Sequence, residues 1–107
     1  MDLVKYFTLE NRLPSLLDKT SLFKLNTDKG TYYLSVSSNN ASVGINLYDN
    51  DFTNEEKSYY EENEFEQIED LESGIYDFDC LLEDLFEIES IEEVSDKEFE
   101  KWSTKWM

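Results

Sequence analysis

The sequence has no histidine and a single cysteine, Cys80. Histidine is the commonest general base at neutral pH and the commonest protein ligand of transition metals. One thiol cannot close an internal disulfide, and without an imidazole partner it is poorly placed to act as a nucleophile. We therefore expect no catalytic residues, no metal site and no cofactor, and we interpret Cys80 as a small apolar residue near a helix face.

Glycine and long apolar runs are also scarce. The three glycines are isolated from one another, whereas phosphate-binding loops need glycines close together. No apolar run approaches the roughly 18 residues that a membrane-spanning helix requires. The first residues, Met1 to Lys5, lack the basic and apolar regions of a secretory signal. Together with the lone thiol, these absences predict a cytoplasmic protein that does not bind membranes.

Basic residues are few, and the acidic residues are concentrated in one segment. The chain holds 26 acidic and nine basic residues, which gives a formal net charge of −17. Residues 1–50 and 94–107 are each neutral, whereas residues 51–93 hold eighteen acids against Lys57 alone. This charge opposes direct binding to nucleic acids. The concentration of acid in 43 residues indicates a function for it, and a merely solvated acidic face is the alternative.

The remaining composition indicates a folded protein. Its 107 residues suit one domain, and 15% of them are aromatic, far more than disordered chains contain. The acidic segment is itself interleaved with aromatic and aliphatic residues. We expect a single domain over 1–107, made of a neutral part (1–50), an acidic helical part (51–93) and a C-terminal helix (95–107).

The hydrophobic pattern predicts an α+β fold that begins with a helix and a small sheet. Residues 2–19 have apolar residues at helical spacing, and Pro14 either separates two helices or opens the second. Residues 21–48 alternate apolar and polar residues, which is typical of half-buried strands. Turn residues occur at 28–30 and 38–40. We predict a three-stranded antiparallel meander over this range.

The rest of the chain is predicted to form helices packed on that meander. Thr53 to Glu56 has the capping-box pattern and Phe65 follows at helical spacing, which predicts a helix over 53–72. Ser73 and Gly74 are predicted to break it before a second acidic helix over 75–88. A further capping box at Ser95 predicts a helix that carries Phe99, Trp102 and Trp106, with the two tryptophans in the core.

The acidic segment supplies the predicted partner-binding residues. On the 75–88 helix, acids at positions i, i+4 and i+8 would form one stripe with about 6 Å between successive carboxylates. Like charges at this spacing weaken a helix, so folding alone does not favour them. Tyrosines lie among the acids and are common at interfaces; they could equally be edges of the core. The predicted set is Tyr59, Tyr60, Glu61, Glu62, Glu64, Glu66, Glu69, Asp70, Tyr76, Asp79, Glu83 and Glu87.

In size and charge layout the chain resembles the functional class of acidic nucleic-acid mimics, mainly through residues 51–93. That class includes phage anti-CRISPR and anti-restriction proteins, uracil-glycosylase inhibitors and immunity proteins of nuclease toxins. The resemblance implies an inhibitor that blocks the basic nucleic-acid-binding or catalytic surface of a partner, without binding nucleic acid itself. One alternative is a non-inhibitory protein–protein interaction module. Another is a small enzyme that uses carboxylates, although the lack of histidine counts against it.

Overall fold

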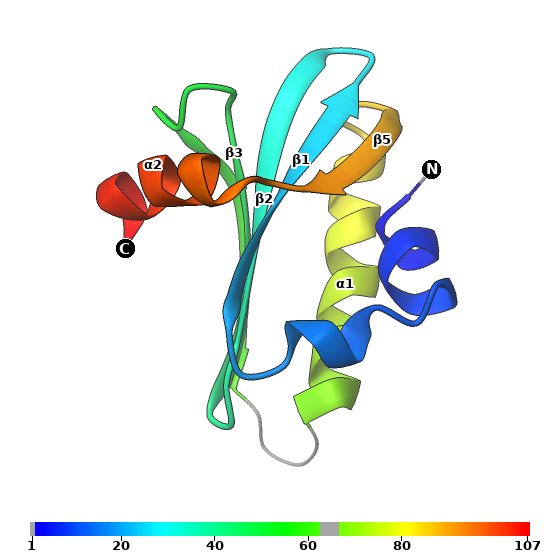
Figure 1. Cartoon of the computed structure of the whole chain (residues 1–107). Coiled ribbons are helices and arrows are strands. Elements are labelled where there is room, and N and C mark those ends of the chain that lie inside the picture. Colours follow the sequence, from blue (N-terminus) through cyan, green and yellow to red (C-terminus); the bar gives the residue numbers. More distant parts are fainter. Residues whose placement is uncertain (1, 63–66) are drawn as a thin grey trace.

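The structure, a computed structural model, describes residues 2–62 and 67–107. The chain is α+β and consists of one five-stranded antiparallel sheet with helices on both faces (Figure 1). The elements follow in the order η1 (Val4–Leu9, a π-helix), η2 (Leu13–Leu16, a 3₁₀-helix), β1 (Thr20–Thr27), β2 (Gly30–Ser38), β3 (Ser42–Tyr48), β4 (Glu55–Glu62), α1 (Gln67–Glu83), β5 (Ile88–Glu93) and α2 (Asp96–Trp106).

The predicted three-stranded meander followed by acidic helices is wrong, because two further strands extend the sheet. The strand order is β4-β3-β2-β1-β5, and every neighbouring pair is antiparallel. Strands β1 to β4 follow one another as hairpins, whereas β5 returns after α1 to pair with β1. The two strands that prediction missed are therefore the two edges of the sheet.

Residues 53–62 form a turn and β4, not the first part of a helix. The backbone N–H of Thr53 donates to the carboxylates of Asp49 (2.7 Å) and Asp51 (3.2 Å), so Thr53 belongs to a turn that Asp49 organises. Phe52 in that turn has a φ of 61°. The turn reverses the chain onto β3, and strand pairing in this hairpin overrides the local helix signal. The prediction for Phe65 lies outside the described residues.

The predicted break at Gly74 is also wrong, because α1 runs through it. A Cβ placed on Gly74 would lie 2.8 Å from the Tyr59 ring and 3.3 Å from the Ile45 side chain. The glycine therefore allows α1 to approach the sheet closely. The helix ends at Glu83, and the last part of the predicted 75–88 helix is instead a loop that leads into β5.

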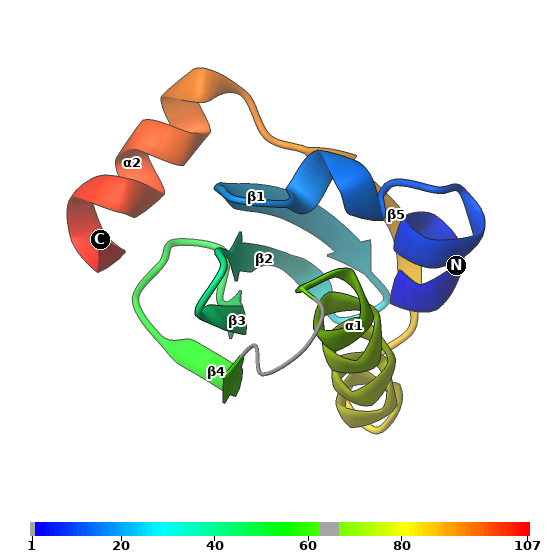
Figure 2. The same ribbon diagram turned by 90° about the horizontal axis from the view of Figure 1, so that it is seen from below.

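Two apolar clusters hold the helices on opposite faces of the sheet (Figures 1 and 2). The larger cluster joins η1, η2 and α1 to one face. It includes the fully buried Phe7, Leu25, Ile45 and Phe78. The smaller cluster lies under α2 and contains Leu22, Tyr33, Tyr48, Phe52 and Trp102.

Both ends of the chain form helices, as predicted. The N-terminal helical segment is divided into η1 and η2, and Pro14 lies in the first turn of η2. The helix over 96–106 is confirmed, with the Ser95 side chain accepting the N–H of Glu98 as its N-cap. Trp102 is buried, whereas Trp106 is 36% exposed.

Candidate protein-binding surface

The solvent-facing side of α1 carries unpaired acids around an aromatic side chain. The helix buries Leu71, Ile75, Phe78 and Leu82 against the sheet, at the spacing of one helical face. That packing leaves Glu69, Glu72 and Asp77 on the outside, beside a Tyr76 side chain that is 60% exposed. These residues border a shallow hollow in the helix surface.

Asp70, although predicted as a contact residue, points partly inward. It is half-buried, and its Oδ2 atom has no hydrogen-bond partner among the described residues. Asp70 therefore offers less surface to a partner than its neighbour Glu69 does.

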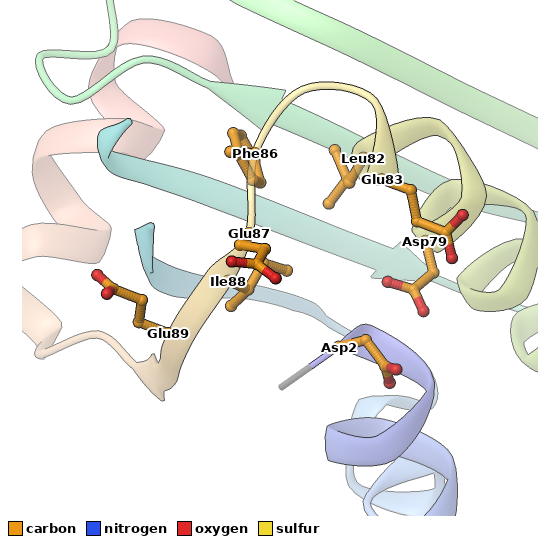
Figure 3. Close-up of a pocket in the computed structure, with 8 residues that line it drawn as sticks. All are labelled: Asp2, Asp79, Leu82, Glu83, Phe86, Glu87, Ile88 and Glu89. Carbon is orange, nitrogen blue, oxygen red and sulfur yellow. The ribbon is translucent and has the colours of Figure 1, made fainter. Parts of the chain in front are cut away.

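A second group of acids surrounds a cleft of about 480 Å³ where α1 ends and β5 begins. Figure 3 shows Asp79 and Glu83 on α1, Asp2 on the N-terminal segment, Glu87 directly before β5 and Glu89 in β5. Apolar side chains from the same elements complete its lining: Leu82, Phe86 and Ile88. The cleft thus combines negative charge with apolar surface, which suits the aliphatic stem and charged end of a lysine or arginine.

Backbone hydrogen bonds fix the position of Glu87 at this cleft. Its N–H donates to the Asp28 carboxylate (2.8 Å), and its carbonyl oxygen accepts the Asp28 N–H (3.1 Å). The β1–β2 turn therefore holds the loop after α1 in place, while the Glu87 side chain remains exposed.

Asp79 is buried, where it binds the N-terminal segment, and is not part of an exposed stripe. Its side chain is 8% exposed and accepts the backbone N–H of Leu3 at 3.1 Å. Burial raises the pKa of Asp79, because desolvation outweighs the stabilising backbone hydrogen bonds. The predicted stripe on one helix face therefore does not form, because Asp79 is buried and Glu87 lies beyond the end of α1. Asp79, Glu83 and Glu87 instead come together around the cleft.

The two predicted tyrosines of β4 lie on opposite faces of the sheet, as neighbours in a strand must. Tyr59 packs against α1, and its hydroxyl donates to the Glu61 carboxylate. Burial and the carboxylate together raise the pKa of Tyr59. Tyr60 is 67% exposed on the other face. Tyr59 is therefore an edge of the core, and Tyr60 is available to a partner.

The remaining predicted residues are divided between the strand and the undescribed segment. Glu61 and Glu62 end β4 and are exposed. Glu64 and Glu66 lie outside the described residues.

We call the exposed acids of α1 and its cleft the acidic band: Glu69, Glu72, Asp77, Glu83 and Glu87. In the part of the chain that the structure describes, none of them is paired with a base. Within residues 2–62 and 67–107 the one ion pair joins Arg12 to Glu10 (3.6 Å), outside the band. Lys97, Lys101 and Lys105 lie on α2, which packs on the opposite face of the sheet from α1 (Figure 2). The tertiary structure thus keeps these three lysines away from the acidic band.

Sequence reasoning missed Asp2 and Glu89 as members of the cleft. Asp2 belongs to the neutral half of the chain, and only the tertiary structure places it near residues some 80 positions later. No spacing in the sequence could have signalled it. Nothing beyond the high acid content of 51–93 marked Glu89.

In the described part of the chain, no group of three or more Asp, Glu, Cys or His side chains is arranged to hold a metal ion. Cys80 is exposed on α1. Neither α1 nor α2 has the length and apolarity needed to cross a bilayer, and the same holds for the shorter helices within the described residues.

Comparisons with known proteins were made against family models, curated proteins and solved structures, and none of the three finds a match.

Proposed function

We propose that this protein is a cytoplasmic, non-enzymatic inhibitor that covers the basic nucleic-acid-binding or catalytic surface of a partner protein. The observation that carries the proposal is the absence of base partners for the acidic band in the described residues. Internal ion pairs would have occupied these carboxylates. The acids instead remain available to lysines and arginines of another protein.

Electrostatics would act mainly on the speed and selectivity of this binding. Opposite charges steer encounter and can raise association rates well above the roughly 10⁵–10⁶ M⁻¹s⁻¹ of uncharged pairs at low salt. Glu69 and Asp77, eight residues apart on α1, are separated by about 12 Å along its axis. Successive acids of the band on α1 are three, five and six residues apart. This irregular spacing favours a general complementarity to a basic surface over a close copy of a phosphate ladder.

A second candidate function has one observation in its favour. The outer side of α1 and the loop that follows it also expose apolar side chains: Ile68, Tyr76, Leu81 and Leu85 are 38%, 60%, 44% and 37% exposed. Such residues suit an interaction module that docks through apolar contacts and merely carries a solvated acidic rim. Salt distinguishes the two functions, because screening weakens charge-driven association and leaves apolar docking almost unchanged.

The experiment is a screen of purified basic nucleic-acid-binding proteins for loss of DNA or RNA binding when the protein is added. The variant Glu69→Gln, Glu72→Gln, Asp77→Asn then removes three charges from the acidic band. The matched control Glu93→Gln, Asp96→Asn, Glu100→Gln removes three exposed charges elsewhere. We expect the first variant to inhibit at least tenfold less well, with a flatter salt dependence, and the control to inhibit as the wild type does. Equal inhibition by both variants would refute the proposal.

A further inference from the structure

The outer edge of β4 has no pairing strand in the part of the chain that the structure describes. β4 is the terminal strand of the sheet and pairs only with β3. Six of its eight residues are exposed, and the other two are half-buried. An edge of this kind presents backbone N–H and C=O groups that can pair with another strand.

The register identifies which backbone groups face outward. The N–H of Ser38 donates to the carbonyl of Lys19 (3.0 Å), which fixes the residues of β2 that point towards β1. Alternation through β3 then directs every second residue of β4 towards β3. The remaining residues, Ser58, Tyr60 and Glu62, turn their N–H and C=O groups away from the sheet.

Most of the usual protections of an edge are missing over this stretch. β4 contains no proline, and its one register irregularity, opposite Leu47 and Tyr48, lies at its beginning. The remaining protection is charge, because Glu55 and Glu56 begin the strand and Glu61 and Glu62 end it. Against a second copy, two antiparallel β4 strands would bring these acids together. The same acids attract a strand that carries lysine or arginine.

We infer that β4 is an acceptor edge for an extended, basic segment of a partner protein, which adds to the sheet as a sixth strand. Its backbone would pair with Ser58, Tyr60 and Glu62, and its basic side chains would lie beside Glu61 and Glu62. Tyr60, 67% exposed, supplies an aromatic surface next to the added strand. The inference deepens the proposed function by naming one mode of contact, but it involves the edge of the sheet and not the acidic band.

The probe is a capped ten-residue peptide of alternating lysine and threonine, titrated at low salt into the isotope-labelled full chain. The control peptide has the same sequence with every backbone nitrogen methylated, so it keeps the charge but cannot donate to a strand. We expect the first peptide to slow amide exchange at Ser58, Tyr60 and Glu62 and to bind at least about tenfold more tightly than the control. Equal binding of both peptides, or no binding of the first at millimolar concentration, would overturn the inference.

A pair of protein variants tests the same edge. Ser58→Pro removes an outward N–H at a position where an edge strand tolerates proline, and Ser58→Ala keeps that N–H. The proline variant should bind the peptide at least about tenfold more weakly, and the alanine variant should match the wild type. Wild-type affinity in a folded Ser58→Pro protein contradicts strand addition. If that variant does not fold, the methylated peptide on the wild type decides alone. Neither experiment alters the acidic band, so the inference and the proposed function can fail separately.

Discussion

The indole N–H of Trp106 donates a 2.7 Å hydrogen bond to the carbonyl oxygen of Phe52, which lies 54 positions earlier in the chain. Phe52 has a left-handed backbone conformation, and its ring packs against Tyr33 with the centroids 4.6 Å apart. The bond therefore ties the end of α2 to the turn that precedes β4. It helps to hold the smaller apolar cluster closed.

Replacing Trp106 with phenylalanine should lower the free energy of unfolding by about 1 kcal/mol, since one hydrogen bond is lost while an aromatic ring is kept. Denaturant unfolding followed by circular dichroism measures the change. The exposed neighbour Lys105 provides the control, because Lys105→Ala should alter stability by less than about 0.5 kcal/mol. Equal stability of Trp106→Phe and the wild type would show that the bond contributes nothing.

Gly74→Ala should destabilise the protein although alanine is the better helix former by about 1 kcal/mol. The new Cβ would meet the Tyr59 ring, and overpacking of this kind costs about 1–3 kcal/mol. We expect a net loss of about 1 kcal/mol in unfolding experiments. Ser73→Ala, at the exposed neighbouring position, should be neutral or slightly stabilising. In a protein that already carries Tyr59→Ala, adding Gly74→Ala should cause no further loss of stability. A loss that persists in that background would locate the strain elsewhere.

Asp79→Asn should make the protein more stable than the wild type at pH 7 but not at low pH. Burial raises the pKa of Asp79 in the folded state, so the folded protein holds this proton more tightly than the unfolded chain does. The contribution of the protonated carboxyl is complete below the unfolded pKa and is lost as pH rises through the folded one. Asparagine stays neutral and can still accept the N–H of Leu3.

Melting temperatures of the wild type and Asp79→Asn, measured from pH 3 to pH 7, test this. The two curves should converge at the acidic end. The pKa of the exposed Asp51 is shifted in the opposite direction, because hydrogen bonds from Thr53 lower it. Asp51→Asn should therefore be relatively less stable at neutral pH. A constant difference between Asp79→Asn and the wild type across this range would contradict the assignment.

Removing the acids that protect β4 should cause self-association. In Glu56→Thr, Glu61→Thr, Glu62→Thr, threonine adds strand preference and removes repulsion between edges. Analytical ultracentrifugation should show larger species than in the wild type, and adding Ser58→Pro should reverse the change. Glu69→Gln, Glu72→Gln, Asp77→Asn loses the same charge from α1 and should behave as the wild type. Association of both triple variants would indicate general charge loss and not strand pairing.

Features that depend on local interactions could be predicted from the sequence. Alternating residues in 21–48 indicated β1 to β3, because a strand with one buried face needs that period. The capping box at Ser95 indicated α2, since its hydrogen bonds join residues only three positions apart. The concentration of acid in 51–93 was also visible directly.

The secondary structure and the exposure of the acidic segment depend on the tertiary structure. The local pattern at Thr53 fits a helix cap, but the chain turns back at this point and pairs with β3, which makes the segment β4. Gly74 looks like a break until α1 is packed against Tyr59 and Ile45. Asp79 looks exposed until the N-terminal segment covers it. Burial and strand pairing arise from contacts between distant residues, so they determined which acids of this segment reach the surface.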